Sequence, residues 1–498
     1  MLIAMIASFR VRRCPPPLPA DDFAVSKFHH MPGKGGIAPR MGYNSQLPDS
    51  TSTPAAPKTH LIRSLGLLEL VLIGIIMVQP TAPMPPFGVF FETGMGHVVT
   101  TVLMAMVAML FTAVSYGRMA RVYPSAGSAY SYVAQEIHPA LGFATGWSML
   151  MDYLLNPLIC VIWGSREAQV HLIPSIPYAV WAVFFTLIFT WANLRRVRTT
   201  ARINAVMAIA MGVVIVAMLA CTAHWVSALP SLSASTFIRP FYDPRYFSWS
   251  RLGGGASIAV LTYIGFDGLS TLSEETKNPR RNILLAMVLT CLIIGVLSAI
   301  EVYAAQLVWP VGKPFQAIET AYTDVARVVG GSTLAIAMSF TLLLANFGSG
   351  SGAQLAGARL LYGMGRSGSL PEGFFGKISA RSGVPANNVM LVGALALLGS
   401  FLISYEDGAQ LLNFGALIGF AGVNFSSFLH YWYRGRDRRL THLVPPLLGF
   451  VICAALWINL DRRAHILGGI WLAAGMVYGF WKTQGFRKTL DFEIPSED

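Results

Sequence analysis

Charge is the property in which this sequence is poorest. Asp, Glu, Lys and Arg make up 12% of its 498 residues, whereas soluble proteins carry about 25%. Hydrophobic residues make up 54%, and apolar runs close to or above the roughly 20 residues needed to cross a bilayer recur along the chain. The composition excludes an ordinary soluble protein and predicts a polytopic, all-α membrane protein.

Paired cysteines and metal-binding histidine motifs are also missing. The five cysteines show no paired spacing and four lie in apolar spans, so we expect free buried thiols rather than disulfides. The ten histidines form no HxxxH or HExxH motif, and no sizeable soluble signalling domain is evident. A membrane enzyme would need a nucleophile–base pair or a metal-ligand cluster at membrane depth. We therefore expect neither an enzyme, nor a bound metal or other cofactor, nor a transport-like receptor without flux.

Basic residues exceed acidic ones, giving a net charge of +12, and their placement is one-sided. Beyond residue 63, 20 Lys and Arg residues fall in loops on one side of the predicted spans and 8 on the other. An excess of Lys and Arg in cytoplasmic loops is the usual orientation signal. It predicts a multi-pass protein of the inner (cytoplasmic) membrane, embedded in lipid, with both termini in the cytoplasm. No nucleic-acid partner is expected.

Three regions follow from composition. Residues 1–60 are polar and proline-rich, which is typical of a disordered cytoplasmic segment, and Met31 or Met41 is an alternative start. Residues 61–482 form the membrane domain, and residues 483–498 a cytoplasmic tail. Twelve membrane spans are predicted, at about 66–90, 97–117, 140–163, 178–194, 203–224, 255–276, 283–308, 331–358, 388–404, 409–432, 443–460 and 465–482.

Two of these spans are interrupted. The span at 66–90 contains four prolines in its outer half, each of which removes a backbone donor. The span at 255–276 contains Gly265-Phe266-Asp267-Gly268. Interruptions at corresponding positions of two halves indicate an inverted repeat. We expect repeats at about 66–224 and 255–432, with the spans of about 443–482 appended.

Five motifs in order resemble one family. They are AVSYGRMARVYPSAGSAYSYV, LGFATGWSMLMDYLLNP, GFDGLSTLSEETKNPRRNI, ARLLYGMGRSGSLP and LLNFGALIGFAGVN, and the likeness covers roughly residues 65–481. The chain resembles the amino acid–polyamine–organocation superfamily, and within it the putrescine-importer-like permeases. The resemblance implies the leucine-transporter-type fold, a 5+5 inverted repeat plus two helices, and secondary active uptake by alternating access.

Asp267 is the first candidate for a substrate-binding residue, together with Gly265, Phe266 and Gly268 around it. A carboxylate inside a membrane span costs about 2.5–3.5 kcal/mol on insertion scales, so it usually faces a partner or a water-filled cavity. Flanking glycines ease the departure from helical dihedral angles. Two interpretations remain: Asp267 pairs with a substrate amine, or it bonds the freed backbone amides of its own break.

Asp152 and Tyr153 are candidates in the third span, which lines the central cavity in the fold that the resemblance implies. Tyr153 offers an apolar face and a hydroxyl to an alkyl-ammonium ligand, or is a packing aromatic. Asp152 is a candidate for coupling or gating. Because adjacent helical residues point about 100° apart, we expect that both cannot face the cavity squarely.

Three further positions are gating or coupling candidates. Glu274 either forms a cytoplasmic gate with a basic residue such as Arg118, or is an interfacial charge. Ser349 and Ser351 either line an ion or substrate path, or belong to a small-residue packing surface. Glu301 is expected at the outer membrane interface rather than as a proton carrier.

The first break bears on the substrate. Gln79, Thr81 and Ala82 are the expected contacts there, but prolines cannot donate the amides that cradle a carboxylate in transporters of this fold. The sequence therefore favours a small amine such as putrescine, with a zwitterionic amino acid as the alternative. Some relatives place a lysine seven residues after the position of Asn204, where this chain has Met211. We expect coupling to H⁺, with Na⁺ as the alternative, and the sequence indicates no oligomeric state.

Overall fold

The computed structural model describes residues 65–123, 128–195, 201–230, 233–274, 276–366, 370–379, 383–435 and 438–486, without the side chains of residues 201–205, Thr271 and Glu274. The predicted disordered segment at 1–60 lies outside the described residues, as does nearly all of the tail. Within them no strand occurs, and the one β pairing is an isolated bridge between Leu65 and Thr276. The prediction of an all-α chain is confirmed for this part of the protein.

The helices follow one another in the order α2 (Leu67–Val78), α3 (Phe87–Thr93), α4 (Val98–Val122), α5 (Ser128–Glu136), α6 (Pro139–Glu167), η1 (Ala168–Leu172), α7 (Tyr178–Leu194), α8 (Ala201–Ser227), α9 (Ala234–Ile238), α10 (Trp249–Ala259), η2 (Val260–Tyr263), η3 (Phe266–Glu274), α11 (Pro279–Val308), η4 (Ile318–Thr320), α12 (Ala321–Arg366), α13 (Glu372–Phe375), α14 (Ala386–Leu402), α15 (Tyr405–Phe428), η5 (Leu429–Tyr433), α16 (Leu440–Ile458) and α17 (Arg462–Lys482). Here η2, η3 and η4 are 3₁₀-helices, and η1 and η5 are π-helical turns.

By length and composition, eight helical segments among the described residues can cross a membrane. They are Val98–Val122, Pro139–Leu172, Val206–Ser227, Pro279–Val308, Ile318–Arg366, Tyr405–Tyr433, Leu440–Ile458 and Arg462–Lys482. Three shorter apolar helices, α2, α7 and α14, coincide with further predicted spans. Large apolar side chains, such as Leu402 on α14 and Trp481 on α17, are exposed on these apolar helices, as expected of surfaces that face lipid rather than water.

Both predicted interruptions are present. α2 ends at Val78, the next residue Gln79 has a φ of 73° outside the helical region, and a proline-rich turn leads into α3. In the second broken span α10 tightens into η2, Ile264 is extended, Gly265 has φ of +113°, and the chain continues as η3. Glycine alone adopts such a φ without strain.

The two broken spans meet at both of their ends. At one end the amide of Lys277 donates to the carbonyl of Leu65 over 2.8 Å. At the other end α3 and α10 pack through glycines, so closely that a Cβ on Gly255 would lie 3.1 Å from the Cα of Gly94. Their central breaks are therefore held next to each other inside the bundle.

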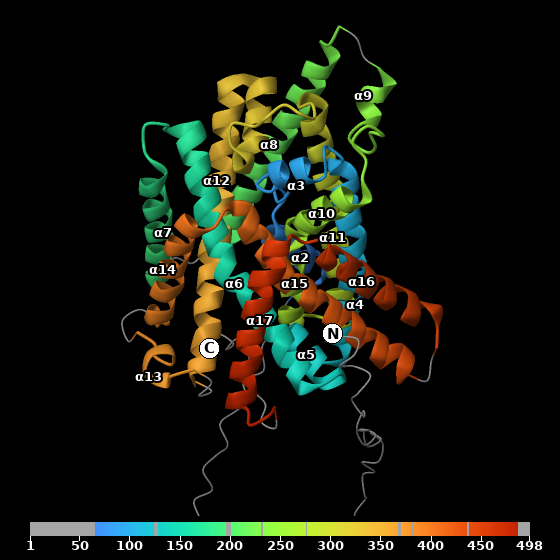
Figure 1. The fold of residues 1–498 in the computed structure, drawn as a ribbon, viewed down its shortest axis with the longest axis vertical. Helices are drawn as coiled ribbons and strands as arrows, with labels where there is room; N and C mark the ends of the chain where they lie inside the picture. The colour runs from blue at the N-terminus through green and yellow to red at the C-terminus, as the bar shows by residue number, and fades with distance from the viewer. Residues whose placement is uncertain are drawn as a thin grey trace, which may run out of the picture. The chain divides into compact units, whose positions relative to one another are not determined.

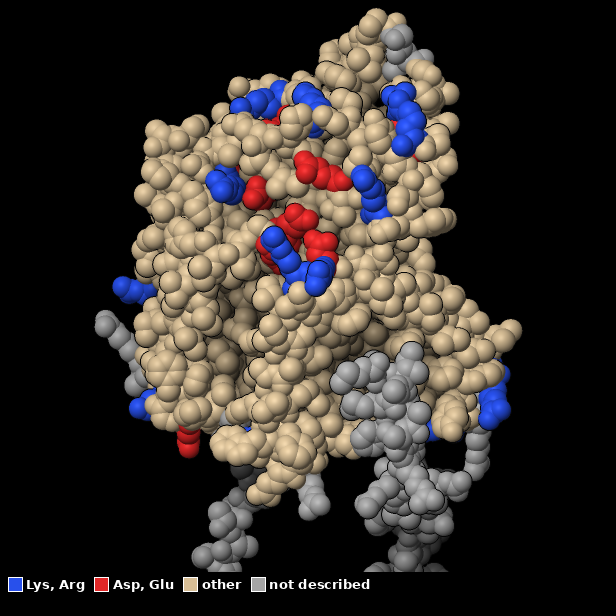
Figure 2. Space-filling view, viewed as in Figure 1, with Lys and Arg blue, Asp and Glu red and all other residues tan. Residues whose placement is uncertain are grey.

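The helices form one bundle in which α3 and α9 lie toward one end and α5 and α13 toward the other (Figure 1). α17 packs against α6 through Trp147 and Trp471, whose rings stack with centroids 5.0 Å apart. Each indole donates to the other residue's carbonyl, over 2.9 Å and 3.0 Å. On the face shown in Figure 2, charged side chains gather toward the end with α3 and α9, and uncharged residues form most of the surface below them.

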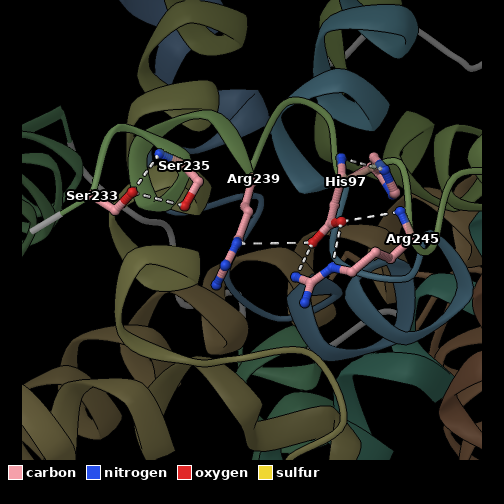
Figure 3. A network of polar contacts seen from close by, with 6 residues as sticks. His97, Ser233, Ser235, Arg239 and Arg245 are labelled. Carbon is pink, nitrogen blue, oxygen red and sulfur yellow. Dashed lines mark hydrogen bonds and ion pairs between the residues drawn. The ribbon is translucent and has the colours of Figure 1, made fainter.

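A polar network ties the loop around α9 to the start of α4 (Figure 3). The Asp243 carboxylate accepts bonds from the Arg245 guanidinium at 3.0 Å and 2.6 Å, and the Asp243 amide donates to Nε2 of His97 over 3.1 Å. The bond from Arg245 lowers the pKa of Asp243 to about 2. This carboxylate therefore stays charged across the physiological pH range and keeps the loop folded around it, while the backbone amide of Asp243 supplies the bond to α4.

Candidate functional site

A cavity of about 510 Å³ lies where the two breaks meet α6, α8 and α12. Its wall contains residues 76–82 of the first break and Gly265, Asp267 and Gly268 of the second. Irregular backbone at membrane depth is tolerated only where protein or a cavity satisfies its polar groups. The cavity is thus built around the backbone that the sequence interrupts.

The first break leaves few backbone amides free. Gln79, Thr81 and Ala82 all line the cavity, where the sequence places them. The amide of Gln79 donates to Ile75 over 2.9 Å, and that of Ala82 donates back to Gln79 over 3.2 Å. The Gln79 side chain donates to the carbonyl of Ala345 on α12 over 2.9 Å. Because the prolines have no N–H, this break offers little to hold a carboxylate.

The second break holds Asp267 at the cavity wall. Backbone amides at Gly265, Asp267 and Gly268 hydrogen-bond its carboxylate. Its carbonyl accepts a 2.7 Å bond from the hydroxyl of Ser270. Asp267 therefore organises the break as well as facing the cavity, and the two interpretations of this residue are compatible.

Asp152 and Tyr153 both line the cavity, although adjacent helical residues point about 100° apart. The cavity follows a broad arc of α6, which also includes Asn156 and Trp163. None of the described residues donates a hydrogen bond to Asp152, and the charge of Asp267 acts on it. No Lys, Arg or His lines the cavity in the described part of the chain. Two carboxylates without a base make the cavity suited to cations.

Phe266 lies away from the cavity, contrary to expectation, and Ser351 does not line it either, which favours the packing alternative for that residue. Phe266 is fully buried and packs edge-on against Tyr116, with centroids 5.8 Å apart, and against Phe420 at 5.5 Å. It therefore points away from the cavity that Asp267 lines. The hydroxyl of Ser351 donates to the carbonyl of Phe347 in its own helix over 2.6 Å, which is the behaviour expected of a packing residue.

Ser349 does line the cavity, and its hydroxyl lies 3.4 Å from Oδ1 of Asn156. Asn156, Trp163, Asn346 and Tyr405 are wall residues that the sequence analysis did not select. Asn156 is four residues after Asp152, a spacing that puts both on one helix face. Met211 also lines the cavity, so the site has a thioether where some relatives have lysine.

The gating candidates have mixed outcomes. The side chain of Glu274 lies outside the described residues. Arg118 donates to the carbonyl of Thr441 over 2.7 Å and lies over the Tyr431 ring. Glu301 is fully buried inside α11, and neither of its carboxylate oxygens has a partner. The expectation that it reaches the membrane interface is therefore wrong, because it lies among packed helices.

A buried ion-pair network lies at the end of the bundle that carries α5. Glu136 is 2% exposed and accepts bonds from His430 at 2.6 Å, Arg434 at 2.7 Å and Tyr123 at 2.7 Å. Burial alone would raise the pKa of this carboxyl, but the bonds from His430 and Tyr123 and the charge of Arg434 outweigh it and hold the pKa below its ordinary 4.5. The network joins α5 to η5 and the residue that follows it.

Comparison with known proteins matches residues 88–460 to the amino acid permease family. The chain is 34% identical over 440 residues to the low-affinity putrescine importer PlaP of Escherichia coli strain K12, covering 87% of this chain and 97% of that protein. It is 29% identical over 418 residues to the branched-chain amino acid permease BcaP of Lactococcus lactis, covering 78% and 87%. It is 23% identical over 468 residues to the methylthioribose transporter of Bacillus subtilis, covering 87% and 96%.

Proposed function

The chain belongs to the amino acid permease family, and from this membership we propose that it is a secondary active transporter that imports a small diamine such as putrescine by alternating access. As a member of a family of multi-pass membrane transporters, it is a transport protein rather than an enzyme. The relative of highest identity reported above is a putrescine importer.

The observation that carries the proposal is the pair of carboxylates in a cavity without a base. Asp267 is already bonded by backbone amides, whereas Asp152 receives no hydrogen bond from the described residues. Two like charges in a poorly hydrated space repel each other, and a dication removes that repulsion. A diamine would place one ammonium at Asp267 and the other at Asp152. Its methylenes would lie against Tyr153 and Trp163.

The chemistry of the first break supports the same choice. An amino acid would bring a carboxylate into a cavity that already holds two, and the amides of Gln79 and Ala82 are engaged. The second candidate is an amino acid permease, which the similarity to the branched-chain permease favours. If the substrate is an amino acid, a cationic one suits the two cavity carboxylates best.

We further propose twelve spans in two inverted repeats of five, with α16 and α17 appended. The α2–α3 and α10–η2–η3 spans are the corresponding broken elements, which supports the repeat. The excess of basic residues supports cytoplasmic termini in an inner membrane, so that α9 lies outside and α5 inside. Coupling to H⁺ is proposed over Na⁺, because buried carboxyl groups are available to carry a proton.

The test is uptake into proteoliposomes that contain the purified full-length protein. Labelled putrescine should accumulate under an acid-outside gradient, and unlabelled putrescine should compete more strongly than leucine or glutamate. Efficient accumulation of a neutral or acidic amino acid, without binding or competition by putrescine, would contradict the proposal and favour the second candidate. Liposomes without protein are the control.

A further inference from the structure

A second buried carboxyl group lies outside the cavity, at the end of α6. Glu167 is fully buried. Its Oε1 accepts hydrogen bonds from Thr323 over 2.8 Å and from Ser339 over 2.5 Å, while its Oε2 has no partner. A buried carboxylate with one oxygen unpaired is costly when charged. Such a group is held as the neutral acid, or waits for a cationic donor to approach.

The segment around Glu167 supplies a polar route toward the surface. His171, one helical turn later, accepts a 2.8 Å bond at Nδ1 from Arg327, so its Nε2 carries the hydrogen and faces Asp324 at 3.6 Å. His171 and Asp324 are 6% and 7% exposed, and Arg327 is exposed. His171 therefore connects the buried Asp324 with the exposed Arg327 at this end of α6.

Glu167 also joins two parts of a broken helix. α12 departs from helical geometry at Gly331, where φ is 65° and ψ is −164°. Thr323 lies before this break and Ser339 after it, and both donate to the same oxygen of Glu167. One turn earlier on α6, Trp163 lines the cavity and donates to the carbonyl of Glu319 over 2.8 Å. A change at Glu167 is therefore connected both to the outer part of α12 and to the cavity wall.

We propose that Glu167 is a proton-binding site, separate from the cavity carboxylates, that takes up the coupling proton from the outer solution. This inference rests on the proposed transport function. The proton leaves a hydronium ion of the outer solution, forms an O–H bond on Oε2, and is released to water once the cavity has opened to the cytoplasm. Without the proton, Oε2 needs a donor, and Arg327 is a cation whose charge already acts on Glu167. Its approach would move the segment of α12 before Gly331.

The surroundings favour a proton over a metal cation. A sodium ion at Glu167 would be repelled by the guanidinium of Arg327, which is among its charged neighbours. Both hydroxyls at the site donate to Glu167 in the present arrangement. The charged and titratable groups on the elements packed against this end of α6 are Asp324 and Arg327 of α12, His171 of η1, Glu319 of η4, Tyr178 of α7 and Tyr405 of α15.

The experiment separates exchange from coupling. Wild type and Glu167→Gln are reconstituted, and putrescine counterflow without a gradient is compared with uptake driven by an acid-outside gradient. We expect Glu167→Gln to keep counterflow within about twofold and to lose at least tenfold of the gradient-driven accumulation, together with the acidification of an internal pH dye. Glu92→Gln, the same change at an exposed acid outside the cavity, should behave as wild type in both assays.

Two results would overturn the inference. One is gradient-driven uptake with dye acidification that persists in Glu167→Gln. The other is loss of both activities in a variant that remains monodisperse and binds putrescine, because that indicates a structural role. Should Glu167→Gln fail to fold, Ser339→Ala answers the same question. Loss of one donor to the charged carboxylate should move the pH midpoint of driven uptake to higher pH, and an unchanged midpoint contradicts the inference. Absence of counterflow in the wild type would instead refute the proposed function.

Discussion

Asp152→Asn is the sharpest test of how the cavity recognises its substrate. The substitution removes one negative charge and keeps the shape of the side chain. Since none of the described residues bonds Asp152, the change should disturb the fold little. Asp267 differs, because backbone amides of its own break bond it, so loss of its charge would affect the local backbone as well as the ligand.

The magnitude follows from the contact that is lost. A hydrogen bond to a charged group is worth about 1.5–3 kcal/mol, and about 1.4 kcal/mol corresponds to a factor of ten in affinity. The inhibition constant of putrescine should therefore rise roughly 10- to 150-fold in Asp152→Asn. Butylamine has a single ammonium group, which Asp267 can hold, so its inhibition constant should change by less than about threefold.

The assay is competition against labelled putrescine in proteoliposomes, with both amines titrated on wild type and variant, and with Glu92→Gln as the surface control. The selectivity of putrescine over butylamine should collapse in Asp152→Asn alone. An equal rise for both amines would show that Asp152 acts on the cavity in general. No change for either would show that it does not contact the ligand, and the assignment of two ammonium positions would be wrong.

Three further outcomes are expected. Gly265→Ala should cut transport severely, since a side chain at φ +113° costs about 1–3 kcal/mol. Gly268→Ala should be tolerated, because its Cβ would meet only the flexible end of the Met77 side chain. Equal uptake by the two variants would contradict this expectation. Trp147→Phe should lower the free energy of unfolding by about 1 kcal/mol, because the indole N–H no longer donates to α17. Thermal unfolding in detergent measures this loss, and uptake should stay at the wild-type rate. Glu136→Gln should lower the unfolding temperature more at pH 7 than at pH 3. A carboxyl with a lowered pKa stabilises the fold above its unfolded pKa and loses that contribution as the pH falls through the folded pKa. A pH-independent loss would argue against the ion pairs.

The sequence alone was enough to locate the apolar helices of the described residues and the two interruptions. Apolar runs of sufficient length and the placement of prolines and glycines are local properties, and they act through local backbone geometry. The same holds for Gln79, Thr81, Asp267 and Gly268, which reach the cavity because the breaks themselves form its wall. A residue at an interruption is thus predictable without knowledge of its neighbours.

The direction in which a side chain points depended on tertiary structure. Phe266 is next to Asp267 in sequence, yet it packs into an aromatic cluster formed with α4 and α15. Asp152 and Tyr153 both reach the cavity because several helices shape an arc that one helical wheel cannot reveal. The burial of Glu301 and Glu167 follows in the same way from packing against helices distant in sequence. Local pattern decides where a helix forms and breaks, whereas burial and partners are set by residues far away along the chain.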